Sequence, residues 1–181
     1  MKLREVDHIA IAVHSLPEAL RLFLDTLGGR FITGGDSALD DIRTVQLELG
    51  GLKIELMQPL GHDSYLQRYL DKHGQGFHHM TVFVEDLFDA IATVERDGYE
   101  VVDTDPSSLP WQETYIRPRS GFGTLIQVVQ TNRTWKEPFP GITLEAILGG
   151  DVQWRDNIPT LRDPDEPRPY DATRPSLRCD P

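Results

Sequence analysis

The chain has 181 residues and carries 18 Lys and Arg against 29 Asp and Glu, a net charge of −11. This acidity argues against a nucleic-acid partner, which would require clustered positive charge, and no apolar run approaches the roughly 20 residues of a membrane span. The length suits one globular domain with an appendage. The single cysteine, Cys179, excludes an internal disulfide, and the first residues lack a signal-peptide pattern, so we expect a cytoplasmic protein without a membrane partner.

An internal repeat organises the first 131 residues. Segment 6–13 aligns with segment 77–84, so that His8 matches His79 at an offset of 71 residues. Apolar residues alternate with polar or small residues in both segments, which is typical of a half-buried strand. Apolar residues at helical spacing follow each segment and end at glycines. The sequence therefore predicts a strand and then a helix in each copy.

Three further strands are predicted after the helix of each copy, and a Gly-Gly pair between the last two strands of the first copy is typical of a hairpin. The predicted elements are strand 6–13, helix 16–27, strands 30–33, 43–49 and 52–57, helix 63–73, strand 77–84, a helix from Leu87, and strands 100–103, 113–117 and 124–130. We expect an α+β fold in which residues 1–131 form a single domain. Two βαβββ modules, 1–61 and 75–131, joined by helix 63–73, would form a curved half-barrel sheet with a metal-containing cleft.

A C-terminal extension, residues 132–181, follows this domain. Six of the 13 prolines lie in the last 27 residues, which lack hydrophobic periodicity. Such a composition buries too little apolar surface to offset the entropy of ordering the chain. The segment 131–154 contains three aromatic residues as candidate anchors, and its structure is ambiguous from the sequence. We expect the extension to be largely irregular.

Strand alternation predicts which polar residues face the cleft. The apolar residues of each strand should face the helices, which leaves the intervening residues on the concave side. Four ligand-type groups then occupy equivalent positions in the two copies: His8 and His79 on the first strands, and Glu55 and Gln127 on the last strands. Two imidazoles, a carboxylate and a carboxamide suit a divalent transition metal with positions left open for substrate or water. Co, Zn, Ni, Mn and Fe all fit, so the metal is not identified.

These segments resemble the vicinal oxygen chelate superfamily, and in particular its methylmalonyl-CoA epimerase and glyoxalase-like branch. The resemblance covers about residues 5–131 and is carried by segments 6–13, 53–64, 76–80, 117–120 and 125–128. It implies the two-module fold and a divalent metal held by the four groups named above. It also implies a small-molecule substrate, such as an acyl-CoA, and a homodimer.

The pattern departs from the epimerases at the last strand, where they have a glutamate and this chain has Gln127. A carboxamide can coordinate a metal but cannot accept a proton, so Glu55 is expected to act as a base. Glu48 is a candidate second base or a solvated strand residue, and Gln46, on the same side of its strand, is a candidate substrate contact. Arg119 stands where epimerases have a lysine. It would hold a carboxylate or phosphate, or be a surface residue of the turn.

The expected function is that of a metal-dependent epimerase or isomerase that removes and returns a proton next to a carbonyl group, through a metal-stabilised enolate. Two alternatives remain open. The first is a lyase or an Fe(II) dioxygenase that uses two histidines and a glutamate. The second is a non-catalytic protein that binds a small molecule, as resistance members of the superfamily do.

Overall fold

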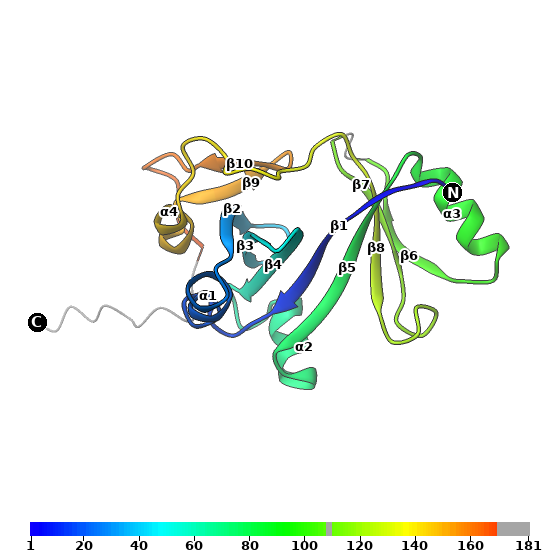
Figure 1. Cartoon of the computed structure of the whole chain (residues 1–181), viewed down its shortest axis with the longest axis horizontal. Coiled ribbons are helices and arrows are strands. Elements are labelled where there is room, and N and C mark those ends of the chain that lie inside the picture. The colour runs from blue at the N-terminus through cyan, green and yellow to red at the C-terminus, as the bar shows by residue number, and fades with distance from the viewer. Residues whose placement is uncertain (108–109, 170–181) are drawn as a thin grey trace, which may run out of the picture.

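The computed structural model describes residues 1–107 and 110–169, which form one curved sheet of ten strands with helices packed on it (Figure 1). The strand order is β10-β9-β2-β3-β4-β1-β5-β8-β7-β6, and the sheet is open. The strands are β1 (Leu3–Ala12), β2 (Arg30–Ser37), β3 (Ile42–Leu49), β4 (Leu52–Pro59), β5 (Gly76–Val84), β6 (Val101–Asp105), β7 (Gln112–Ile116), β8 (Leu125–Gln130), β9 (Val152–Arg155) and β10 (Ile158–Leu161). The mixed α+β composition and the curved, open sheet confirm the fold class predicted from the sequence.

The helices are short and most begin at a side-chain cap. They are α1 (Leu16–Leu20), which continues as the π-helical η1 (Arg21–Thr26), then α2 (Tyr65–His73), α3 (Leu87–Arg96) and α4 (Leu144–Gly149). Ser15 accepts a hydrogen bond from the Glu18 N–H at the start of α1, and Asp86 accepts one from the Asp89 N–H at the start of α3. In the described part of the chain no helix is long and apolar enough to cross a membrane.

The two first strands of the repeat lie side by side at the centre of the sheet. β1 runs antiparallel to β5, and each runs parallel to the last strand of its own module, β4 or β8. In this register His8 lies opposite Thr81, and Ala10 lies opposite His79. The pairing brings the two histidines, which are 71 residues apart in sequence, to neighbouring positions.

The helices α1 and α3 cover the outer face of the sheet. Leu16 and Leu20 of α1 pack in one buried cluster with Leu47 and Leu56 of the sheet, and α3 packs in a second cluster on the other module. The joining helix α2 lies on the opposite, concave face, where Leu66 belongs to a cluster with the small β1 residues Ala10 and Ala12. Helix α2 thus closes one end of the concave side and leaves the rest of that side open.

The described part of the C-terminal extension contains one helix and two short strands, and its other residues are irregular. Residues 144–161 form α4, β9 and β10, and β9 adds to the edge of the sheet beside β2, with Gln153 opposite Asp36. Ile147 of α4 and Val152 of β9 are buried in the same cluster as α1. The short strands of the extension make their apolar contacts with the first module. Local sequence patterns carry no information about these long-range contacts. Residues 170–181, where the irregular arm was also predicted, lie outside the described residues.

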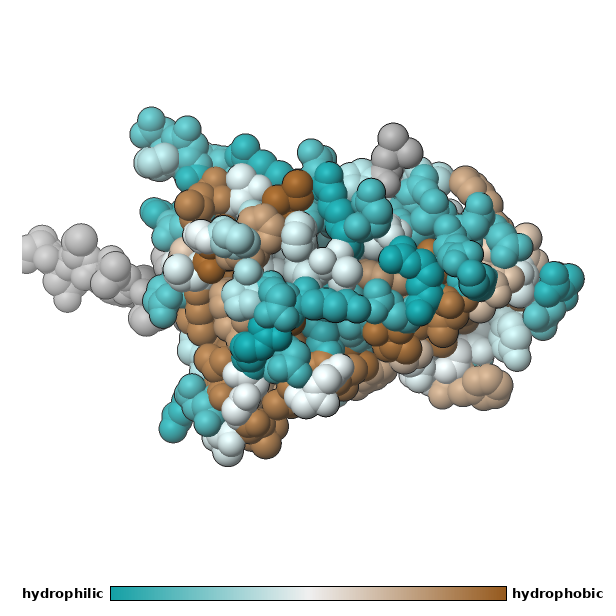
Figure 2. Space-filling view, turned by 45° about the horizontal axis from the view of Figure 1, so that its top comes forward, coloured by the Kyte–Doolittle hydropathy of each residue, from teal (hydrophilic) through white to brown (hydrophobic). Residues whose placement is uncertain are grey.

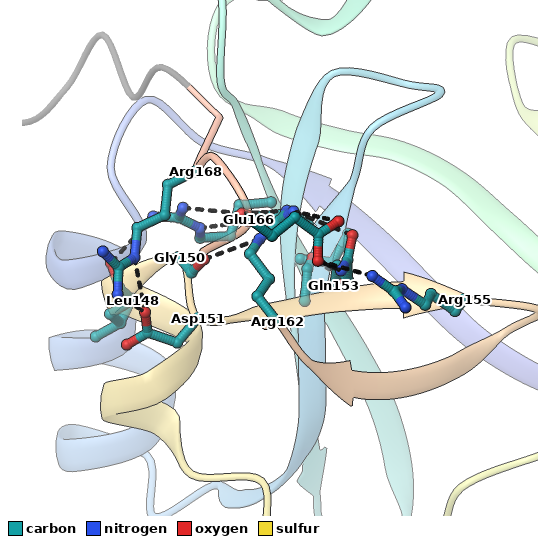
Figure 3. Close-up of polar contacts among 12 residues, drawn as sticks. Leu148, Gly150, Asp151, Gln153, Arg155, Arg162, Glu166 and Arg168 are labelled. Atoms are coloured by element: carbon teal, nitrogen blue, oxygen red, sulfur yellow. Dashed lines mark hydrogen bonds and ion pairs between the residues drawn. The ribbon is translucent and has the colours of Figure 1, made fainter. Parts of the chain in front are cut away.

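Buried charges attach the extension to the first module. Asp36 is fully buried, and its carboxylate contacts Arg43 Nε at 2.6 Å and Arg162 Nη2 at 3.3 Å. Arg162 also donates to the Gly150 carbonyl and to Gln153 Oε1, each at 3.0 Å, as Figure 3 shows among the contacts of the extension. Glu166 accepts hydrogen bonds from Gln153 and Arg155 in the same group. The extension is therefore fixed to β2 and β3 by charge-assisted hydrogen bonds as well as by apolar packing.

Candidate metal centre

A cavity of about 380 Å³ opens on the concave side of the sheet and is lined by both modules and the extension. Its wall contains His8, Glu55, His79 and Gln127. Figure 2 shows one face of the molecule, with hydrophilic side chains spread over most of it and hydrophobic ones in separate areas. The cavity combines polar donors and acceptors with aromatic side chains, a composition typical of a small-molecule site.

Three metal-ligand groups meet in this cavity. His8, Glu55 and His79 each offer one ligand atom, and these atoms all lie within 4.8 Å of one another. Both histidines are buried, and Glu55 is nearly so, which removes competing water from the donors. Two imidazole nitrogens and one carboxylate oxygen in a partly closed pocket are a suitable donor set for a divalent transition metal. These residues therefore fit a bound metal ion.

The orientation of His8 is set by a second group of buried residues. Its Nδ1 lies 2.7 Å from Asp7 Oδ2, and the other Asp7 oxygen lies 2.8 Å from Lys53 Nζ. Thr134 also donates to that second oxygen, at 2.9 Å. Because Asp7 engages Nδ1, Nε2 of His8 is directed toward Glu55, whose carboxylate lies 3.5 Å away. This arrangement leaves Nε2 as the His8 atom that could bind a metal.

The electrostatics of the centre favour a positive charge among its donors. Burial by itself would raise the pKa of Glu55, but the charge of His8 and hydrogen bonds from His8 and Gln46 hold that pKa at about 2. Burial would lower the pKa of His8, and the neighbouring carboxylates raise it to about 9. Burial and the charge of His8 lower the pKa of His79 to about 3, so His79 is neutral. A carboxylate that is buried against an imidazolium is a site where a metal cation can replace a proton.

Gln127 connects this group to the second module. Its Oε1 accepts a hydrogen bond from Thr81 Oγ1 at 2.6 Å, and Thr81 in turn lies 3.0 Å from His8 Nε2. Its Nε2 donates to Glu113 Oε2 at 2.6 Å and to the Tyr115 hydroxyl at 3.0 Å. The carboxamide oxygen of Gln127 thus faces the histidines, while its nitrogen holds a second carboxylate.

The other sequence-predicted site residues divide between the cavity and the surface. Gln46 lines the cavity and donates to Glu55 Oε1 at 2.9 Å, and its own buried Oε1 has no hydrogen-bond partner among the described residues. Glu48 is not part of the cavity wall. It lies at the hairpin end of β3, where it accepts a hydrogen bond from the Gly51 N–H and lies 3.8 Å from Arg30 Nε. The alternation predicted its face correctly but not its distance along the strand from the centre.

Of the two alternatives left open for Arg119, the structure matches the surface residue of the turn. It stands on the exposed turn between β7 and β8 and pairs there with Glu100. It is absent from the cavity wall within the described residues.

The sequence reading missed Glu113, a second carboxylate in the cavity wall. It lies on β7, is half-buried, and accepts hydrogen bonds from Trp111 Nε1 at 2.7 Å and from Gln127 Nε2. Burial raises the pKa of Glu113, although the hydrogen bonds act in the opposite direction. The alternation of strand 113–117 places Glu113 and Tyr115 on one side, which is the signal that would have found it. The extension residues of the wall lie outside the repeat and had no such signal.

Comparison with known proteins agrees with this geometry. The family model of the Glyoxalase/Bleomycin resistance protein/Dioxygenase superfamily matches residues 7–114. The chain belongs to this superfamily. Its matched residues include three of the four predicted metal donors and Glu113, whereas the extension lies beyond them.

The relatives and structural neighbours include methylmalonyl-CoA epimerases. The chain is 30% identical over 133 residues to the mitochondrial methylmalonyl-CoA epimerase of Homo sapiens, covering 71% of this chain and 74% of that protein. It is 26% identical over 130 residues to the uncharacterized protein YqjC of Bacillus subtilis, covering 71% of this chain and 93% of that protein. The crystal structure of methylmalonyl-CoA epimerase from Mycobacterium tuberculosis matches with a TM-score of 0.63 and 26% identity, covering 72% of this chain and 90% of that chain. The chain therefore belongs to the methylmalonyl-CoA epimerase-like branch of the superfamily.

Proposed function

We propose that this protein is a metal-dependent epimerase or isomerase that moves a proton on the carbon next to the carbonyl of an acyl-CoA. The observation that carries this proposal is the cluster of His8, Glu55 and His79 in a cavity that is also lined by the half-buried carboxylate of Glu113. The relationship to epimerases that act on methylmalonyl-CoA supports the reaction class. Epimerisation requires both features: a cationic centre for the enolate oxygen and groups that exchange a proton with carbon.

His8, Glu55 and His79 would hold the metal, and Gln127 is the proposed fourth donor through its Oε1. A divalent metal bound by these residues supplies Lewis acidity, which polarises a carbonyl oxygen and increases the acidity of the adjacent C–H bond. Gln46 donates a hydrogen bond from Nε2 to Glu55 and is proposed to orient that carboxylate. Its buried Oε1 lacks a partner among the described residues, and we propose that this oxygen accepts a hydrogen bond from the substrate.

Glu55 and Glu113 are the proposed proton-transfer groups. They come from β4 and β7, on opposite modules, and both line the cavity. One carboxylate removes the proton from one face of the substrate carbon, and the other returns a proton to the opposite face, which inverts the centre. Trp111 and Gln127 hold Glu113 through N–H donors and so fix the direction of its free lone pairs. Glu113 takes the role that the sequence reading gave to Glu48.

Solvent deuterium incorporation tests the reaction and the role of Glu113 together. With methylmalonyl-CoA in heavy water, the metal-loaded wild type is expected to incorporate deuterium at the carbon between the two carbonyl groups. Glu113→Gln should lower the incorporation rate by roughly 100-fold or more, because loss of a general acid–base group typically costs that much. Mass spectrometry of the recovered thioester measures the rate.

Glu48→Gln is the matched control for this experiment, since it makes the same change on a strand of the site but outside the cavity wall. Its exchange rate should equal that of the wild type. No incorporation by the wild type at saturating substrate would remove methylmalonyl-CoA as a substrate. Equal rates for both variants would remove Glu113 from the reaction.

Asp7→Asn tests whether the buried carboxylate positions His8 for metal binding. The substitution keeps the shape but removes the charge that holds Nδ1 of His8 and Nζ of Lys53. The affinity for Co²⁺, measured by calorimetric titration, is expected to fall about 10- to 100-fold, the usual loss when an outer partner of a histidine ligand is removed. Asp25→Asn, on the exposed side of η1, should leave the affinity unchanged. An unchanged affinity in Asp7→Asn would show that Asp7 does not position this ligand.

Two histidines and one carboxylate are also the ligand set of non-haem Fe(II) oxygenases, which makes oxygenation the second candidate. The two functions separate in one assay. Oxygen uptake by the Fe(II)-loaded protein with a catechol would favour the oxygenase, and proton exchange with Co²⁺ in the absence of oxygen would favour the epimerase.

A further inference from the structure

The C-terminal extension provides part of the cavity wall, although it lies beyond the residues that the family model matches. Arg133 and Trp135 follow β8, and Trp154 and Asn157 come from the hairpin of β9 and β10. Figure 1 shows the segment after β8 crossing from the second module to α4 beside the first module. The extension therefore contributes side chains to the site in addition to lengthening the sheet.

We propose that Arg133, together with Trp135 and Trp154, forms an anion-binding subsite that selects substrates carrying a carboxylate or phosphate. The identity of the substrate in this inference rests on the proposed function. The position of the subsite does not, because it follows from the extension residues that line the cavity. It assigns to the extension the recognition role that the sequence reading gave to Arg119.

Each of these side chains is held in place by a contact outside the subsite. Trp154 Nε1 donates to Thr44 Oγ1 at 3.0 Å, so its indole is fixed against β3. Trp135 packs edge-to-face on Phe139, with ring centroids 4.7 Å apart. Arg133 donates from Nη1 to the backbone carbonyl of Asp156, at the tip of the hairpin. Groups that are already positioned lose little conformational entropy when a ligand binds.

The charges of the cavity wall indicate that Arg133 is the group that binds an anion. Among the described residues the wall has one lysine and one arginine, Lys53 and Arg133. Lys53 is neutralised by Asp7 at 2.8 Å. Arg133 forms no ion pair with a carboxylate of the described residues, and the one hydrogen bond of its side chain leaves further guanidinium donors available. A planar guanidinium can donate two parallel hydrogen bonds to a carboxylate or phosphate. Trp135 and Trp154 line the same cavity as Arg133.

The acidic side chains of the wall make this position more selective. The carboxylates of the wall are those of Asp7, Asp40, Glu55, Asp105, Glu113 and Asp156, and they disfavour an anion wherever no cation faces it. Apart from the proposed metal centre at His8, Arg133 is then the cationic position of the wall that is open to an anionic group of the substrate. The neighbouring Thr134 contacts Asp7, which places this subsite next to the residues that support His8.

Intrinsic fluorescence offers a direct measurement, because all three tryptophans of the chain line the cavity. Methylmalonate and inorganic phosphate serve as small anionic probes and are titrated at constant ionic strength. Arg133→Met is expected to weaken the binding of the anion at least tenfold, the usual effect of losing a charged hydrogen bond. Arg133→Lys keeps the charge without the fork geometry and should retain intermediate affinity. Arg21→Met, on the exposed surface of η1, is the matched control and should bind like the wild type.

Thioester probes then identify which anion is recognised. Isobutyryl-CoA carries a methyl group where methylmalonyl-CoA carries its carboxylate. If Arg133→Met weakens only methylmalonyl-CoA, the subsite binds the acyl carboxylate. If it weakens both thioesters equally, the subsite binds a phosphate of the CoA group. Either result supports the subsite.

Two results would overturn the proposal: equal binding of the small anions by wild type and Arg133→Met, or no response of the wild type to either anion. Circular dichroism of the variants checks that the fold is retained, and Arg133→Lys provides a charge-conserving comparison if Arg133→Met is unstable. If the small anions bind at Arg133 but neither thioester binds, the subsite stands and the acyl-CoA function fails.

Discussion

Replacing His8 with alanine is expected to reduce the divalent metal retained by the purified protein from about one ion per chain to a trace. His8 contributes a buried nitrogen to a group of three ligand atoms that lie within 4.8 Å of one another. Its loss leaves only one imidazole and one carboxylate of that group. His79→Ala removes the second imidazole and should have the same effect. Elemental analysis after loading with Co²⁺ and dialysis measures the stoichiometry.

His14→Ala is the matched control, since it removes an exposed histidine close to the end of β1. It should retain the full metal content. Retention of a stoichiometric metal by both His8→Ala and His79→Ala would contradict the proposed centre. A wild type that retains no metal under any loading condition would favour the non-catalytic binding alternative.

The second large effect is expected for Asp36→Ala, which should lower the free energy of unfolding by about 3–5 kcal/mol, the cost of breaking a buried ion pair from one side. Asp36 is fully buried, and the side chains of Arg43 and Arg162 that contact it are 3% and 6% exposed. The substitution removes the carboxylate that both buried guanidinium groups contact. Because Arg162 belongs to the extension, the packing of β9 and β10 should loosen as well. Urea unfolding followed by circular dichroism gives the free energy.

Asp97→Ala is the corresponding exposed control. Asp97 pairs with Arg96 at 3.1 Å, with both side chains more than half exposed. Such surface pairs contribute about 0–1 kcal/mol, so this variant should unfold almost like the wild type. An Asp36→Ala variant as stable as Asp97→Ala would mean that the buried charges are not what attaches the extension to the sheet.

The repeat in the sequence predicted much of the arrangement of the site. His8 and His79 occupy the same position of the two first strands, and the structure pairs those strands at the centre of the sheet. Alternation placed Glu55 and Gln127 on the side of the histidines, and both residues line the cavity. A period of two residues determines the face of a strand to which a side chain points, and this information is local.

The same rule could not predict how far along the strand a side chain lies from the centre. Glu48 points to the predicted side but lies at the end of the hairpin, where it contacts Arg30. Glu113 lies in the cavity because β7 pairs with β8 in a register that places it near Gln127. Strand register and twist depend on the whole sheet. The local sequence therefore could not predict that Glu113 lines the cavity and that Glu48 lies outside it.

The sequence alone predicted the mixed fold class and the residues proposed to bind the metal, because both predictions follow from short-range patterns that occur twice in the chain. Only the tertiary structure decided where the extension lies. Its strands are short, and its apolar residues become buried only against α1 and β2 of the first module. The carboxylate of Asp36 and the guanidinium of Arg162 are distant in sequence and meet at the edge of the sheet. Such long-range contacts bring Arg133 and two tryptophans to the cavity, and a local pattern carries no information about them.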